Sequence, residues 1–145
     1  MTNSTFNVRL FSRWAAVTLM ALTVGFTTSC KDEEEDERVP PDLSFKTGAN
    51  YTFANKIVGM GDSVLVGCVV TKKEDDLKSF NISVSYDGGA LSTRFNHFTT
   101  GAEVGGYAHD YWIVTRSQAG TEKWVFTVVD KDGNQTQKNI VLTVQ

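Results

Sequence analysis

The side chains that could do chemistry are few in this chain of 145 residues, and they lie far apart. Its two cysteines are Cys30 and Cys68, and its two histidines are His97 and His109. A catalytic thiol needs a nearby histidine or cation, and a zinc site needs Cys or His at short spacing. Cys68 has no such neighbour in the sequence, and His97 and His109 are too far apart for a local metal pair. The chain also lacks the short motifs of hydrolases, metalloproteases and phosphate-binding loops. We therefore predict a protein that is not an enzyme and uses no cofactor or metal.

Asp130, Asp132 and Asn134 carry oxygen ligands of the kind that calcium prefers. An EF-hand loop starting at Asp130 would need an acid at its twelfth position, where this chain has Val141. Asp132-Gly133 is also typical of a tight hairpin turn. We expect the turn rather than a calcium site.

Cys30 has a distinctive position, because it ends an apolar stretch. Arg9 and Arg13 precede thirteen uncharged residues, 14–26, and the small residues 27–29 follow. Thirteen helical residues rise about 20 Å, which is too short for the roughly 30 Å hydrocarbon core of a bilayer. The pattern is typical of a secretory signal peptide. The alternative is a permanent anchor helix.

Thr27-Thr28-Ser29-Cys30 resembles the lipobox of bacterial lipoproteins. The resemblance implies cleavage before Cys30 and attachment of acyl chains to its sulfur, so that the membrane becomes a partner through a lipid anchor. The next residues resemble the export signal of Bacteroidota surface lipoproteins and imply an outer-membrane protein that faces the cell exterior: Lys31, Asp32, Glu33, Glu34, Glu35, Asp36 and Glu37. The alternative is an acidic linker on a lipoprotein that faces the periplasm.

The acidic run and the following Val39-Pro40-Pro41 predict an extended, solvated tether, because like charges repel and adjacent prolines exclude a helix. The predicted organisation is a signal peptide at 1–29, a lipidated tether at 30–41 and one domain at 42–145. That domain carries eleven acidic and ten basic residues, so it lacks the charge of a nucleic-acid-binding protein. With Cys30 acylated, Cys68 would be a small buried hydrophobic residue. A Cys30–Cys68 disulfide is the alternative.

Strand patterns fill residues 42–145. Alternation is clearest over 80–86, where Phe80, Ile82 and Val84 predict one buried face. Similar inward sets are expected at 64–70, 124–128 and 140–144, and weaker strands at 43–47, 91–98 and 107–116. Glycine-containing turns at 61–62, 87–89 and 132–133 separate them. About seven strands in this length indicate an all-β sandwich.

The stretch 120–134, GTEKWVFTVVDKDGN, together with 140–144, IVLTV, is similar to the last two strands of bacterial immunoglobulin-like domains, including polycystic-kidney-disease-type repeats. Trp124 occupies the place where such domains often have Tyr, and Cys68 has no cysteine partner near Phe126. The resemblance implies an immunoglobulin-like antiparallel β-sandwich. It implies a fold only.

Two classes of function fit these features. The first is a surface module for adhesion, structure or interaction with an outer-membrane protein. The second is a glycan-binding lipoprotein in which Tyr107, Tyr111 and Trp112 form a stacking platform; these rings could instead pack in the core. Its polar partners would be Arg94, His109 and Asp110. The parity that Trp112 shares with Asp110 favours an outward-facing Trp112.

One modification site is also suggested by a short motif. Asp62-Ser63-Val64 resembles the O-glycosylation motif of exported Bacteroidota proteins and implies modification of Ser63. Asp62-Ser63 is equally suited to a turn before a strand.

Overall fold

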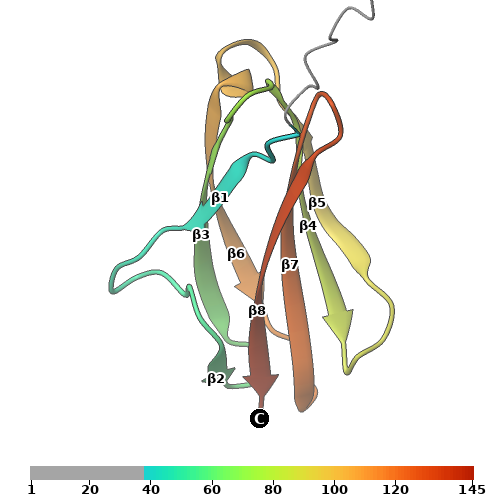
Figure 1. The fold of residues 1–145 in the computed structure, drawn as a ribbon. Coiled ribbons are helices and arrows are strands. Elements are labelled where there is room, and N and C mark those ends of the chain that lie inside the picture. Colours follow the sequence, from blue (N-terminus) through green and yellow to red (C-terminus); the bar gives the residue numbers. More distant parts are fainter. Residues whose placement is uncertain (1–37) are drawn as a thin grey trace, which may run out of the picture. The chain divides into compact units, whose positions relative to one another are not determined.

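The computed structural model describes residues 38–145, which form two packed β-sheets (Figure 1). One sheet has the strand order β1-β3-β6, and the other has the order β2-β8-β7-β4-β5. One short 3-10 helix, η1 (Gly101–Val104), precedes β6. The strands are β1 (Asp42–Phe45), β2 (Lys56–Val58), β3 (Ser63–Thr71), β4 (Leu77–Tyr86), β5 (Ser92–Phe98), β6 (Gly106–Val114), β7 (Gly120–Asp130) and β8 (Gln135–Val144).

The core lies between the two sheets, because successive side chains of a strand point to opposite faces. The predicted inward sets are confirmed as buried: Val64, Val66, Cys68 and Val70 on β3, Phe80, Ile82 and Val84 on β4, Trp124, Phe126 and Val128 on β7, and Ile140, Leu142 and Val144 on β8.

Cys68 behaves as the sequence predicts. Its side chain is 1% exposed within this core, and burial raises the pKa of its thiol to about 12. A thiol with so high a pKa stays protonated at neutral pH and is a poor nucleophile.

The arrangement is an immunoglobulin-like β-sandwich, as predicted, with one strand more than expected. The additional strand is β2, which is three residues long and therefore too short to show alternation. It pairs in parallel with β8, whereas the other strand pairs are antiparallel. The chain thus moves from one sheet to the other between β1 and β2.

The predicted turns are confirmed. Asp87 and Gly88 both have positive φ in the β4–β5 turn, and Gly133 has φ 90° between β7 and β8. The Asp130 carboxylate accepts a hydrogen bond of 2.8 Å from the backbone N–H of Asn134. This oxygen of Asp130 therefore stabilises a hairpin turn, as expected from the sequence.

Candidate binding site on the three-stranded sheet

The outward face of the β1-β3-β6 sheet carries large exposed apolar side chains at one end of β6. Trp112 and Val114 on β6 are 63% and 64% exposed, while their neighbour Ile113 is fully buried. This result confirms that Trp112 faces outward. Leu65 of β3 lies directly opposite Trp112 in the sheet and is half-buried. An exposed tryptophan on a rigid sheet is the kind of feature that marks binding surfaces.

The connection between β1 and β2 runs alongside β3 and forms a wall next to this face. The backbone N–H of Lys46 donates to the carbonyl of Gly67 at 2.8 Å, and that of Thr52 donates to the carbonyl of Leu65 at 2.7 Å. Backbone hydrogen bonds therefore hold the connection to the sheet at its first residue and again at Thr52.

Side chains of the same connection pack over the middle of β3. The Asp110 carboxylate accepts hydrogen bonds from Lys46 Nζ at 2.7 Å and from Tyr51 Oη at 3.1 Å. The hydrogen bond between Lys46 and Asp110 lowers the pKa of the carboxyl and raises that of the ammonium. Gly67 makes room for this layer, since a Cβ there would lie 2.6 Å from the Lys46 side chain and 2.7 Å from the Tyr51 ring.

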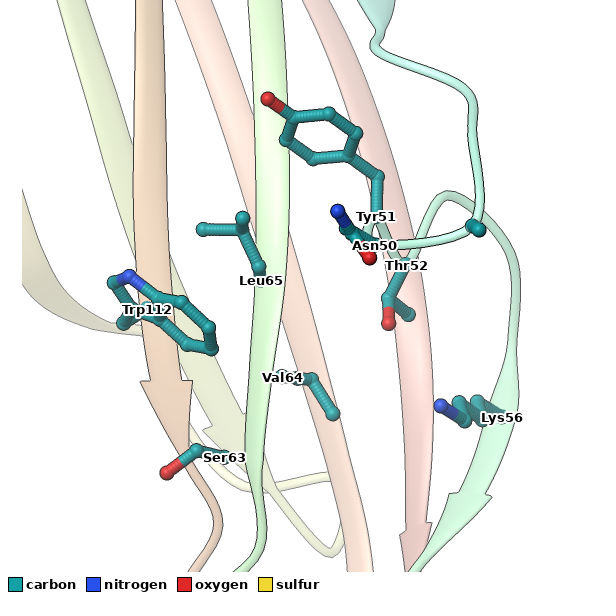
Figure 2. Close-up of a pocket in the computed structure, with 9 residues that line it drawn as sticks. Asn50, Tyr51, Thr52, Lys56, Ser63, Val64, Leu65 and Trp112 are labelled. Carbon is teal, nitrogen blue, oxygen red and sulfur yellow. The ribbon is translucent and has the colours of Figure 1, made fainter.

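A shallow groove of about 360 Å³ results, and we call it the Trp112 groove. Figure 2 shows Trp112 on one side of β3 and the residues 50–52 on the other, with Leu65 between them. Ser63 and Lys56 also line the groove. Its volume lies near the lower end of the range for small-ligand pockets, about 300–1,000 Å³.

The structure does not bring the three predicted stacking rings together. Tyr107 and Tyr111 have the parity of the buried Ile113, so they point to the opposite side of β6 from Trp112. Tyr107 stacks on His97 of β5 at 4.7 Å between centroids, and Tyr111 lies 6.1 Å from the ring of Trp124. Both tyrosines pack against the core and so do not form the stacking platform, in agreement with the alternative prediction that these rings are core residues.

The predicted polar partners are also separated. His109 lies on the inner side of β6 and stacks on Phe95 at 4.3 Å, and burial lowers its pKa. Arg94 donates a hydrogen bond of 3.2 Å to Tyr86 Oη. Only Asp110 lies on the same face as Trp112, and there it is paired with Lys46.

Two other predictions concern modified residues. Ser63 is exposed at the start of β3 and lines the groove, so its O-glycosylation stays a prediction. Cys30 and the export signal 31–37 lie outside the described residues. The groove residues that the sequence did not indicate are residues 49–52, which belong to a connection without alternation, and Lys56, which begins the three-residue strand β2.

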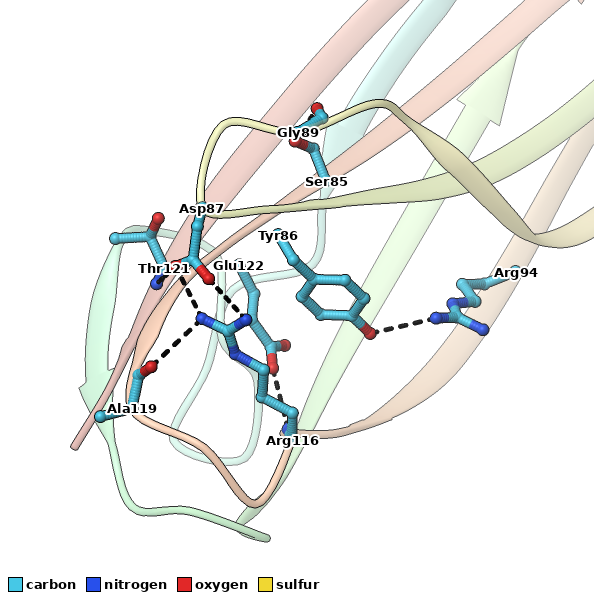
Figure 3. A network of polar contacts seen from close by, with 9 residues as sticks. All are labelled: Ser85, Tyr86, Asp87, Gly89, Arg94, Arg116, Ala119, Thr121 and Glu122. Atoms are coloured by element: carbon cyan, nitrogen blue, oxygen red, sulfur yellow. Dashed lines mark hydrogen bonds and ion pairs between the residues drawn. The ribbon is translucent and has the colours of Figure 1, made fainter.

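A second polar cluster lies where the β4–β5 turn meets the β6–β7 connection (Figure 3). The two oxygens of Asp87 bind the two terminal nitrogens of Arg116, each at 2.7 Å, and Thr121 donates its backbone N–H to Asp87 at 2.8 Å. The guanidinium also lies over the Tyr86 ring. These contacts join three segments, and we interpret the cluster as structural.

A buried carboxylate extends this cluster into the core. Glu122 is fully buried, and its two oxygens accept hydrogen bonds from the backbone N–H of Arg116 at 2.8 Å and from Trp124 Nε1 at 3.0 Å. In many immunoglobulin-like domains a tyrosine hydroxyl at this corner bonds to the backbone. Here the Glu122 carboxylate accepts the hydrogen bond from the backbone, and Trp124 donates its indole N–H to the same carboxylate.

The Asp87–Arg116 pair predicts a specific pH dependence. Arg116, followed by the Thr121 N–H, lowers the pKa of Asp87 to about 2 from its ordinary 3.8. A lowered pKa in the folded state stabilises the fold above pH about 4, and this contribution is lost as the pH falls towards 2. Asp87→Asn tolerates the same positive φ but lacks the charge. Its melting temperature should lie below that of the wild type at pH 7 and approach it near pH 2. A gap that stays constant over this range would contradict the assignment.

Within residues 38–145, no group of three or more His, Cys, Asp and Glu side chains is placed to hold a metal ion. The same part of the chain has no helix that is long and apolar enough to cross a bilayer.

Comparison with known proteins yields likenesses of fold. No family model and no curated protein sequence match the chain. One similar chain comes from a structure on T cell specificity and activation by the bacterial superantigen toxic shock syndrome toxin-1. It has 13% sequence identity and a TM-score of 0.44, and the match covers 72% of this chain and 99% of that one. A CARDB domain from Pyrococcus furiosus, in complex with di-metal ions, has 15% sequence identity and a TM-score of 0.43. The match covers 72% of this chain and 96% of that domain. Murine CRIg has 16% sequence identity and a TM-score of 0.39, and the match covers 74% of this chain and 99% of the CRIg chain. These likenesses carry no information on ligand or activity.

Proposed function

We propose that this protein is a non-enzymatic binding module, held by acyl chains on Cys30 at the outer membrane of a Bacteroidota cell and facing the exterior. The observation that carries the binding role is the Trp112 groove, in which a 63% exposed indole lies beside a fixed polar wall. A sandwich with a closely packed core of apolar side chains provides a rigid support for such a surface. Both function classes inferred from the sequence require a surface of this kind.

The anchoring part of the proposal rests on the order of the sequence features. A positive start, a short apolar stretch and small residues lead to Cys30, and six acids follow within the next seven residues. Each buried methylene of an acyl chain contributes about 0.8 kcal/mol, so several chains give a stable anchor where one is marginal. In this proposal residues 30–41 form the tether and residues 42–145 form the presented domain.

Cys30→Ala tests the anchor. We expect the variant to be found in the soluble fraction or as an uncleaved precursor, because the acylated sulfur is gone. Cys68→Ala is the matched control, since it removes the other thiol, and it should stay in the outer-membrane fraction. The measurement is immunoblotting of fractionated cells, with metabolic labelling by a fatty-acid analogue.

Two outcomes would contradict separate parts of the proposal. A cleaved Cys30→Ala variant at the wild-type level in the outer membrane would exclude lipid anchoring through this residue. Protection of the wild-type domain from protease added to intact cells would exclude exposure on the cell surface.

A further inference from the structure

The chemistry of the Trp112 groove identifies a class of ligand. We propose that the groove binds a short saccharide, with one sugar ring stacked on the exposed face of the Trp112 indole. This inference rests on the binding role proposed above and specifies what is bound. It also defines the site by residues of the β1–β2 connection, which lie apart from the Tyr107 and Tyr111 rings.

The groove combines an aromatic face with an open hollow. A pyranose ring presents a row of C–H groups with partial positive charge, and the face of an aromatic ring is negative. Trp112 is 63% exposed and lies opposite Leu65 in the sheet, so its indole is supported from one side and open to solvent on another. Val114, on the same side of β6, is as exposed but offers no flat face.

Much of the remaining lining of the groove is polar. Sugar hydroxyls both donate and accept, so they need amides, hydroxyls and ammonium groups rather than a continuous apolar wall. Asn50 offers an amide, Ser63 a hydroxyl and Lys56 an exposed ammonium, and all three line the groove. Figure 2 shows Asn50 and Lys56 on the side of β3 that lies away from Trp112.

The wall of the groove is held in place by hydrogen bonds before any ligand binds. Thr52 is held by its backbone hydrogen bond to Leu65, and Tyr51 is held by its bond to Asp110. A preformed wall loses little conformational entropy on binding. Weak stacking and hydrogen bonding can therefore yield measurable affinity for a small ligand.

A protein partner fits this face less well. A stable protein interface buries about 800 Å² on each side, and its centre is depleted of charged residues. Here the ion pair of Lys46 and Asp110 lies beside the groove, and Lys56 lines it. The concave, polar and small shape of the site favours a sugar.

The test is a titration of the full-length protein with defined oligosaccharides: gluco-, xylo-, manno- and galacto-oligomers and oligogalacturonate. Binding is followed by tryptophan fluorescence and by calorimetry. Trp112→Ala should weaken the binding by about tenfold or more and abolish the fluorescence change. Trp112→Phe should keep part of the affinity, because it keeps a flat ring. Val114→Ala is the matched control and should bind as the wild type does.

The outcomes separate this inference from the proposed function. Sugar binding that is lost in Trp112→Ala and kept in Val114→Ala supports the saccharide site. Failure of every oligosaccharide to bind, or equal binding by Trp112→Ala, overturns it. A photoreactive residue at position 112 that crosslinks to an outer-membrane protein on intact cells, with no sugar bound, would also overturn it while leaving the binding role intact. Circular dichroism and melting curves confirm that each variant is folded.

Discussion

Phe126→Ala is expected to lower the free energy of unfolding by about 3–5 kcal/mol. Phe126 is fully buried in β7, and its ring contacts Phe45 of β1 edge-on at a centroid distance of 5.2 Å. β7 and β1 belong to different sheets, so this aromatic pair joins the two layers. Truncation would leave a cavity between them, which is costly because the sheets can close it only in part.

The loss would be a large share of the stability of a domain this size, which is about 5–15 kcal/mol in total. Urea unfolding followed by circular dichroism measures it. Lys123→Ala is the matched control, because Lys123 lies on the exposed side of the same strand and its change should be about 0.5 kcal/mol or less. Similar unfolding midpoints for the two variants would mean that Phe126 does not join the sheets as described.

Glu122→Ala is expected to destabilise the domain by about 2–6 kcal/mol. An N–H donor that loses its acceptor inside a protein costs about 1–3 kcal/mol, and this substitution removes the acceptor of two donors. The donors are the backbone N–H of Arg116 and the indole N–H of Trp124, both bonded to the buried carboxylate. Removing the acceptor leaves the buried indole N–H of Trp124 and the partly buried N–H of Arg116 without their partner.

Glu122→Gln separates the hydrogen bonds from the side-chain volume. It keeps the shape and one acceptor oxygen, so it should cost clearly less than Glu122→Ala in the same urea experiment. Equal losses for the two variants, or a loss below about 1 kcal/mol for Glu122→Ala, would show that the carboxylate is not the acceptor on which this corner depends.

The sequence predicted the long strands well because a sandwich buries one face of each strand. Phe80, Ile82 and Val84 alternate with polar residues, and that alternation follows directly from the geometry of a half-buried strand. β6 was more difficult, since both of its faces carry aromatic rings. The charge of Asp110 indicated the outward parity, because an unpaired carboxylate is costly to bury.

Other features could not be predicted, for identifiable physical reasons. Tyr51 and Asp110 meet although they are 59 positions apart, and no local pattern records such a contact. Glu122 is an exception to the rule that carboxylates lie at the surface. It lies two residues before Trp124 on β7, so both side chains point to the same, buried face of the strand. That shared parity was the one signal that could have revealed its burial.

The parallel pairing of β2 with β8 determines when the domain can finish folding. The backbone N–H of Val141 donates to the Asn55 side chain at 2.8 Å, and these residues are 86 positions apart. Contacts between positions so distant require the closure of a long loop, so they form slowly. During synthesis the edge at Lys56–Val58 therefore has no partner until the last strand has left the ribosome. Folding of the sandwich can therefore be completed only after β8, its last strand of ten residues, has been synthesised.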